Sequence, residues 1–341
     1  MPQRATRHCR LLCILGLTVS SCGLAWTQVS IGFPPSHKLV VLSVPDKASA
    51  LQLDIRQLKL ETNTLQADAG SSEIVADDAS WQLTATARSA VKAQDTKMLR
   101  AQEQNKLPAG ATQVSVSELG SLTALEYFVE AIKGRNVHQK HVMVFLVGGD
   151  LSFSVHISKL AYYPDDERFF SAFLGSLKII ENFQPDSRTR FGYGNAFYHQ
   201  KDWSGAIQQY EKTLDLERER RALPQKEWRV LVDNLGMAYA ASGDLPKAKQ
   251  MFEFGITQDP EYPMFHYHLA CAEAGASDLD GALLDLTAAF RYHRNSAAAE
   301  ALPDPARDSS FEKYLNDPRF RTLAQQLCPS SHQTQSGFLC D

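Results

Sequence analysis

The sequence has little net charge, few cysteines and, beyond its start, no long apolar run. Its 341 residues carry 35 lysines and arginines against 39 acids, without a basic stripe, which argues against a nucleic-acid partner. After residues 11–19, no segment approaches the roughly 18 consecutive apolar residues of a membrane-spanning helix. We therefore expect a soluble chain, or one held at a membrane only by a lipid.

The catalytic motifs that a sequence can reveal are also missing. There is no Gly-x-Ser-x-Gly elbow, no Walker-type loop and no His-Glu-x-x-His. Gly192-Tyr193-Gly194 begins like a dinucleotide-binding turn, but Phe197 stands in place of the third glycine. The sequence predicts that the protein is not an enzyme and holds no cofactor.

The histidine pairs do not predict a metal site. His138 and His141 are three apart on an expected strand, which points them to opposite faces. His266 and His268 are two apart on an expected helix and diverge in the same way. No metal ligand set can be named from these residues.

Residues 1–21 have the pattern of a secretory signal peptide. Three arginines precede the apolar run 11–19, and small residues follow it. Val19-Ser20-Ser21-Cys22 resembles a bacterial lipobox, which implies lipidation of Cys22, whereas cleavage after Ala25 would leave a free protein starting at Trp26. The lipobox is favoured because it gives Cys22 a role. Either way the protein is expected to be exported, as a periplasmic or a lipid-anchored protein of the cell envelope.

Two later cysteines bracket a short polar stretch near the end of the chain. In an exported protein, Cys328 and Cys340 could form a disulfide that closes the tail. Cys271 lies within an expected helix and is predicted to be a small buried residue.

Residues 38–184 predict an α+β domain. Apolar residues alternate with polar ones around Leu51 and Trp81, as in half-buried strands, and strands resume at 113–116 and 122–129. Residues 142–147 are apolar on both faces, and Gly148-Gly149-Asp150 turns them into an antiparallel partner strand. Helices are expected at 93–106 and, with an apolar stripe reaching Ile180, from Pro164 onward.

Residues 138–180 carry a family resemblance. A charged strand, a tight turn, a second strand ending in His-Ile-Ser-Lys and a helix with an acidic start follow in the order HQKHVMVFLVGGDLSFSVHISKLAYYPDDERFFSAFLGSLKII. This stretch resembles the PsbP-like domains of exported bacterial proteins. The resemblance implies an antiparallel-sheet α/β sandwich and an exported protein, but no activity.

Residues 187–294 contain three helical hairpins in a shared register. The clearest, at 229–262, pairs small residues (Gly236, Ala248, Gly255) with large ones (Leu235, Tyr239, Phe252) around a Gly-Asp turn. It resembles a tetratricopeptide (TPR) repeat, and copies at 187–220 and 263–294 follow the same register. The resemblance implies an all-α repeat domain. Residues 296–341 are expected to form capping helices and a tail.

In such repeats the first helices line a groove for a partner. The positions expected there are Phe191, Asn195, Tyr198, His199, Asp233, Met237 and Tyr267. Phe191 and Asp233 stand where a carboxylate-gripping groove would have basic residues, so an apolar peptide or helix is the favoured ligand. Part of this face could instead pack on the neighbouring domain or on the capping helices.

The sequence therefore predicts a non-catalytic adaptor or scaffold of the bacterial cell envelope. It would bind a protein or peptide through the groove, and would meet a membrane only through a possible lipid anchor. In the alternative reading, the first domain binds a small ligand or metal and the repeats deliver it to a complex.

Overall fold

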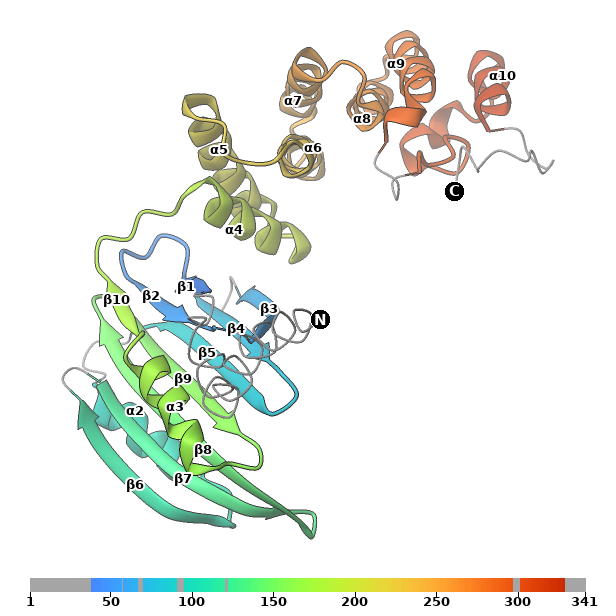
Figure 1. Cartoon of the computed structure of the whole chain (residues 1–341). Helices are drawn as coiled ribbons and strands as arrows, with labels where there is room; N and C mark the ends of the chain where they lie inside the picture. Colours follow the sequence, from blue (N-terminus) through green and yellow to red (C-terminus); the bar gives the residue numbers. More distant parts are fainter. Residues whose placement is uncertain are drawn as a thin grey trace, which may run out of the picture. The chain divides into compact units, whose positions relative to one another are not determined.

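The computed structural model describes residues 38–56, 58–66, 70–90, 95–119, 122–296 and 301–328. The expected signal peptide and Cys22 therefore lie outside the described residues, and their assignments stay predictions. The chain divides at Phe183 and Gln184 into two compact units, an α+β unit and a helical unit (Figure 1). Among the described residues, no helix has the length and apolar character needed to span a membrane.

Unit 1 is built on a seven-stranded antiparallel sheet of order β3-β4-β5-β9-β8-β7-β6. The strands are β3 (Lys59–Gln66), β4 (Ser71–Asp77), β5 (Trp81–Ser89), β6 (Ala111–Leu119), β7 (Leu122–Ile132), β8 (Arg135–Gly148) and β9 (Leu151–Lys159). Gly149, at a φ of 57°, makes the turn of the β8–β9 hairpin. The predicted hairpin at Gly148-Gly149-Asp150 is thus present, and β8 has partners on both edges.

A second sheet packs on one face of the first. It has the order β1-β2-β10, formed by β1 (Leu39–Ser43), β2 (Ala50–Asp54) and β10 (Lys178–Ile180). Alternate residues such as Leu83, Ala85 and Val155 are fully buried between the two sheets, in one apolar cluster with Leu51 and Leu53. The period-two pattern of the sequence therefore marks the face of each strand that the core covers.

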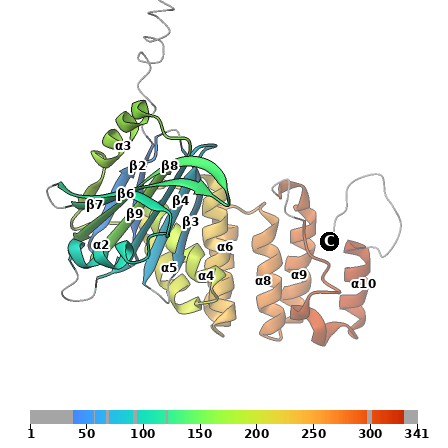
Figure 2. The ribbon, with the colours of Figure 1, turned by 90° about the horizontal axis from the view of Figure 1, so that it is seen from below.

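Two helices flank the large sheet on opposite faces (Figures 1 and 2). α2 (Thr96–Gln104) contacts β7 and β8, and the short helix η1 (Pro164–Asp166) leads into α3 (Glu167–Leu174), whose Phe170 and Phe173 enter the core. The second helix is shorter than the sequence predicts. It ends at Gly175, and Ile180 lies in β10, paired with Ala50. Glycine weakens a helix and β-branched isoleucine suits a strand, so the pairing with β2 prevails.

Unit 2 consists of three helical hairpins followed by short C-terminal helices. The hairpins are α4 (Ser187–His199) with α5 (Trp203–Glu219), α6 (Gln225–Ala241) with α7 (Leu245–Gln258), and α8 (Pro263–Gly275) with α9 (Leu279–Arg291). Behind them come η2 (His293–Asn295), η3 (Ser309–Tyr314) and α10 (Pro318–Leu327). The structure thus contains the two parts expected, an antiparallel α+β unit and an all-α unit.

The second hairpin begins earlier than its sequence pattern suggests. α6 starts at Gln225, one turn before Arg229, and only a short loop joins it to α5. Buried Glu217 closes that loop by accepting hydrogen bonds from the backbone N–H groups of Ala222 and Leu223. Of residues 221–228, which separate the copies at 187–220 and 229–262, the last four form the first turn of α6 and the others belong to the short loop after α5.

The turn of each hairpin is fixed by an aspartate. Asp202, Asp244 and Asp278 each accept a hydrogen bond from the backbone N–H three residues on, at 3.0, 3.2 and 3.0 Å. Gly243, with a φ of 91°, supplies the left-handed residue before the middle cap. The Gly-Asp pair of the sequence is thus a turn residue followed by a helix N-cap.

We expect Asp244→Ala to lower the free energy of unfolding of unit 2 by about 1 kcal/mol, because the first turn of α7 loses its cap. Asp244→Asn, which keeps an acceptor oxygen, should stay close to the wild type. Urea unfolding followed by circular dichroism measures both. Equal losses for the two variants would show that the cap contributes nothing.

Candidate functional site

The first helices of the hairpins, α4, α6 and α8, lie next to one another and share one face. We define the first-helix face by the side chains that meet across these helices or lie beside them. They are Asn195, Tyr198 and His199 of α4, Asp233, Asn234 and Met237 of α6, and His268 and Cys271 of α8. Hydrogen bonds join the helices at each junction of this face.

A tyrosine from the second helix of the first hairpin joins α4 to α6. The Tyr210 hydroxyl donates to Asn195 Oδ1 at 2.8 Å and accepts from Asn234 Nδ2 at 3.2 Å. Burial is the main cause that raises the pKa of Tyr210, so it stays a neutral donor at physiological pH. Both asparagines are therefore engaged within the protein.

An ion pair joins α6 to α8. His268 Nδ1 lies 2.5 Å from Asp233 Oδ1, and both side chains are largely buried. Burial opposes the charge on His268, but the Asp233 carboxylate outweighs it through its charge and hydrogen bond, and the pKa of His268 is raised. Asp233, which the sequence places on the groove, is thus largely neutralised from the next hairpin.

The C-terminal segment covers the face at α8. The Tyr267 hydroxyl donates to Asp308 Oδ2 at 2.9 Å, and its ring meets Phe311 edge-on at 6.3 Å. Cys271 Sγ lies 3.9 Å from the same Asp308 oxygen, and burial raises the pKa of the Cys271 thiol. Asp308 also caps η3 by accepting from the Ser310 N–H at 2.8 Å. The first helix of the third hairpin therefore packs against the C-terminal segment, which is the alternative in which part of this face contacts the capping helices.

Two of the seven expected groove residues are buried. Tyr267 is 1% exposed beneath η3, and Phe191 is 8% exposed with its ring 6.2 Å from that of Tyr210. In this packing neither side chain presents a surface to a partner. An alanine at Tyr267 would remove core packing, so it could not separate binding from stability.

The other five residues retain solvent-accessible surface. Tyr198 is half-buried, with its ring edge-on to Trp203 at 5.4 Å, and Met237 is half-buried in the same apolar cluster. Asn195 and Asp233 are partly exposed, and His199 is exposed at the end of α4. The accessible apolar part of the face is therefore Tyr198 with Met237.

The sequence interpretation missed three members of the site, namely Asn234, His268 and Asp308. Asn234 and His268 are separated by the 34 residues of the repeat, so they occupy equivalent positions in successive first helices. That equivalence is a signal that could have placed both on the junctions. Asp308 carries no such signal, because it belongs to the C-terminal segment.

Two of the remaining histidines, His141 and His156, lie together with His141 Nδ1 3.0 Å from His156 Nε2, whereas His266 and His138 have other partners. His266 contacts Asp285 and the Pro260 carbonyl, on the side away from His268, and His138 contacts Glu130. Within the ranges that the structure describes, no group of three or more His, Cys, Asp or Glu side chains could hold a metal ion. The expected partner of Cys328, Cys340, lies outside the described residues, so that disulfide stays a prediction.

Solved structures with a similar arrangement of helices share little sequence with this chain. PcrH from Pseudomonas aeruginosa is 21% identical, with 33% of this chain and 80% of that chain covered and a TM-score of 0.30. The Sgt2 TPR domain from Aspergillus fumigatus is 20% identical, with 45% and 89% covered and a TM-score of 0.31. The Yersinia enterocolitica type III secretion chaperone SycD, solved with a peptide of the translocator YopD, is 15% identical, with 41% and 89% covered and a TM-score of 0.29. Likenesses at these values say nothing of function.

A family match covers the clearest part of the repeat unit. No curated protein matches the chain. Residues 234–299 match the tetratricopeptide repeat family, a range that runs from the middle of α6 past the end of α9. The match supports the repeats that the sequence predicts, while the PsbP-like resemblance and export stay predictions. This chain thus contains a segment that matches the tetratricopeptide repeat family.

Proposed function

We propose that this chain is a non-catalytic adaptor that binds a protein partner on the first-helix face. The observation that carries the proposal is that Tyr198 and Met237 are both partly exposed on a face whose polar groups already bond to each other. Asn195, Asn234 and Asp233 have partners within the unit, so a bound peptide need not satisfy them. The repeat match at residues 234–299 supports the same role.

The partner's chemistry follows from what the face leaves accessible. A phenol ring and a thioether are apolar, adaptable contacts that suit an aliphatic or aromatic side chain of an extended peptide or a helix. Charge on the partner has little to pair with, because Asp233 is held by His268 at 2.5 Å. We therefore propose an apolar segment as the ligand, bound over α4 and α6.

Charge introduced at this face tests the proposal. Met237→Glu should weaken the partner at least tenfold, since a carboxylate would have to be desolvated against an apolar segment. Leu284→Glu is the matched control, because Leu284 is 71% exposed on α9, away from the first helices. A photocrosslinking residue at exposed position 199 captures the partner, and the adduct is quantified in each variant.

Both variants must keep the wild-type helical content for the comparison to hold. Loss of the adduct with Met237→Glu and its retention with Leu284→Glu would support binding on the first-helix face. If Met237→Glu leaves the adduct intact, the partner binds elsewhere and the proposal fails.

We further propose that the adaptor acts in the bacterial cell envelope, supported by the arginine-led apolar run of residues 11–19 and by Val19-Ser20-Ser21-Cys22. Intact-mass measurement of the protein purified from its own membrane fraction tests this. A chain that starts at Cys22 with a lipid supports a tethered adaptor. One starting at Trp26 supports a free exported protein, and a mass that retains residues 1–21 would exclude both forms.

A further inference from the structure

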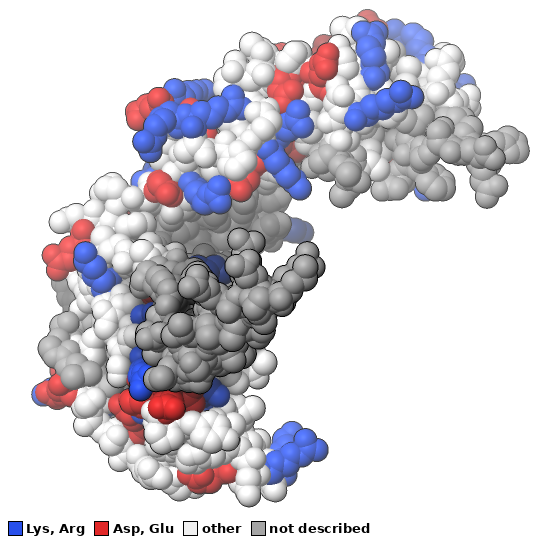
Figure 3. Space-filling view, viewed as in Figure 1, with Lys and Arg blue, Asp and Glu red and all other residues white. Residues whose placement is uncertain are grey.

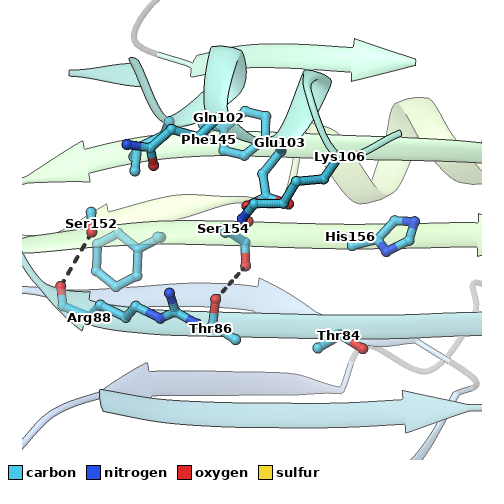
Figure 4. A pocket seen from close by; sticks show the side chains of 12 residues that line it. Thr84, Thr86, Arg88, Gln102, Glu103, Lys106, Phe145, Ser152, Ser154 and His156 are labelled. Carbon is cyan, nitrogen blue, oxygen red and sulfur yellow. Dashed lines mark hydrogen bonds and ion pairs between the residues drawn. The ribbon is translucent and has the colours of Figure 1, made fainter. Parts of the chain in front are cut away.

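A pocket of about 320 Å³ opens on the face of the large sheet that lies away from the unit 1 core (Figure 4). Its floor comes from β5 and β9, and its roof from α2 and the residues that follow it. The lining residues that carry functional groups are Thr84, Thr86, Arg88, Gln102, Glu103, Lys106, Ser152, Ser154 and His156. A volume of this size accommodates a small organic molecule.

The strand periodicity explains why this pocket is polar. On β5 and β9, the residues that alternate with the buried Ala85, Ala87 and Val155 point away from the core, and most carry hydroxyl groups. α2 packs over β7 and β8, which leaves this part of the sheet open beside the helix. The hydroxyl of Thr86 donates to the Ser154 carbonyl at 3.4 Å, which joins the two floor strands through a side chain.

The charges around the pocket do not cancel. Lys106 Nζ pairs with Glu103 Oε1 at 2.6 Å, so these two roof residues neutralise each other. Burial lowers the pKa of His156, which therefore stays uncharged at neutral pH. The Arg88 guanidinium has no ion pair within the residues described here. The lining thus has one surplus positive charge, on the floor.

The pocket also has an apolar wall. Leu99 of α2 and Phe145 of β8 line it, and Phe145 is otherwise buried between helix and sheet. Figure 4 shows Gln102, Glu103 and Lys106 above the strands, Phe145 beside Gln102, and Arg88 below them along β5. A ligand can therefore meet a cation and an apolar surface within the same cavity.

We propose that this pocket binds a small organic monocarboxylate with an aromatic or aliphatic body. The carboxylate pairs with Arg88, whose planar guanidinium suits two parallel hydrogen bonds, and takes further ones from the hydroxyls of Thr84 and Ser154, because those of Thr86 and Ser152 already donate to backbone carbonyls. The apolar body lies against the half-buried side chain of Leu99. One surplus positive charge matches one carboxylate better than a doubly charged phosphate. The site does not depend on the adaptor role of the repeats.

Calorimetric titration of the full chain with benzoate tests the site, with benzamide as its uncharged counterpart of similar shape and inorganic phosphate as the oxyanion without an apolar body. We expect benzoate to bind at least tenfold more tightly than benzamide, because charged hydrogen bonds exceed neutral ones by that much, and at least tenfold more tightly than phosphate, because phosphate has no apolar body to bury. Equal binding of benzoate and benzamide, or no binding of benzoate, overturns the proposal. Phosphate binding as tightly as benzoate overturns the part of it that assigns an apolar body.

Two arginine variants test whether benzoate binds in this pocket. Arg88→Gln should reduce benzoate affinity at least tenfold, to the level of benzamide, without unfolding the sheet, since Arg88 is exposed. Arg135→Gln is the matched control, an exposed arginine at the start of β8 that does not line the pocket. If the two variants weaken benzoate equally, or if Arg88→Gln binds it like the wild type, the assignment to this pocket is wrong.

Discussion

Phe252→Ala is expected to lower the free energy of unfolding of unit 2 by about 3–5 kcal/mol, as for other buried phenylalanines. The Phe252 side chain is 1% exposed and lies over Gly236 of the preceding helix. A Cβ added at Gly236 would come within 2.4 Å of the Phe252 ring, so the ring occupies the space that the glycine leaves open. Urea unfolding followed by circular dichroism measures the loss.

The three hairpins vary this pair in a way that sharpens the prediction. Gly194 with Tyr210 and Gly236 with Phe252 combine glycine with an aromatic ring, whereas the register places Ala270 opposite Leu286 in the third. We expect Gly236→Ala alone to destabilise by about 1–3 kcal/mol through overpacking, offset in part by the better helix propensity of alanine. Adding Phe252→Leu should restore part of this loss, because the pair then matches the third hairpin.

Gly192→Ala is the control for helix propensity. Gly192 lies in α4, and a Cβ added there would meet nothing within 4 Å. This variant should be about 0.5–1 kcal/mol more stable than the wild type. If Gly236→Ala is as stable as Gly192→Ala, or if the double variant loses the sum of the two single losses, close packing of ring on glycine does not explain the repeat pattern.

The same contacts show why the repeats could be predicted from the sequence. Gly236, Phe252 and Asp244 contact residues within one hairpin, so their spacing along the chain fixes the geometry. The end of α3 could not be predicted in this way. A helical apolar period continues to Ile180, and only the pairing of β10 with β2, far away in the sequence, selects the extended form.

The candidate site was predictable in part for the same reason. The repeat register places Asn195, Tyr198, Asp233 and Met237 on the first helices, where the structure has them. The register does not show how deeply each of these side chains is buried. Tyr267 has an equivalent place in the register, but Phe311 and Asp308 of the C-terminal segment cover it. The ion pair of Asp233 is likewise made with His268 of the next hairpin. The repeat period can place residues at the junctions between hairpins, but it does not show which side chains meet there.

Mixed charge over the surface agrees with the small net charge of the sequence. On the described residues visible in Figure 3, lysines and arginines lie among aspartates and glutamates in both units. Surface charge of this kind contributes little to stability and is screened by salt. Buried histidines behave differently, because the fold shifts their pKa values.

The two units are expected to respond to pH in opposite directions. In unit 1, burial is the main cause that lowers the pKa of His141 to about 4, and a charge on His156, 3.0 Å away, would lower it further. Tyr127 stacks on His141, and Glu103 is the acid that acts on His156. In the unfolded chain His141 binds a proton near pH 6.5, whereas in the folded unit it stays neutral down to about pH 4. The free energy of unfolding of unit 1 therefore decreases as pH falls from about 6.5 towards 4. After allowance for partial exposure, the loss is about 1–2 kcal/mol.

The stability of unit 2 is expected to depend on pH in the opposite direction. The pKa of His268 is raised by Asp233 and, less, by Asp308, and that of His266 by Asp285 and the Pro260 carbonyl, in both cases against the effect of burial. Its folded form binds protons more tightly than the unfolded chain. The stabilisation is therefore complete below about pH 6.5 and is lost as pH rises through the folded pKa values.

The full chain is unfolded with urea at about pH 4.5, 6.5 and 8.5. Hydrogen exchange, always labelled at the same pH and measured by mass spectrometry, then reports the unfolding of peptides from each unit separately. Unit 1 should unfold at less urea on the acid side and unit 2 at less urea on the alkaline side. His141→Gln should weaken only the pH dependence of unit 1 and His268→Gln only that of unit 2, because each removes one of the shifted histidines of its unit and leaves His156 or His266 in place. Parallel shifts in both units, or slopes that these substitutions leave unchanged, would mean that other groups govern the pH response. Opposite slopes that these substitutions reduce would instead show that buried histidines set the pH response of each unit: His141, kept neutral by burial, makes unit 1 sensitive to acid, and His268, kept charged by Asp233, makes unit 2 sensitive to alkali.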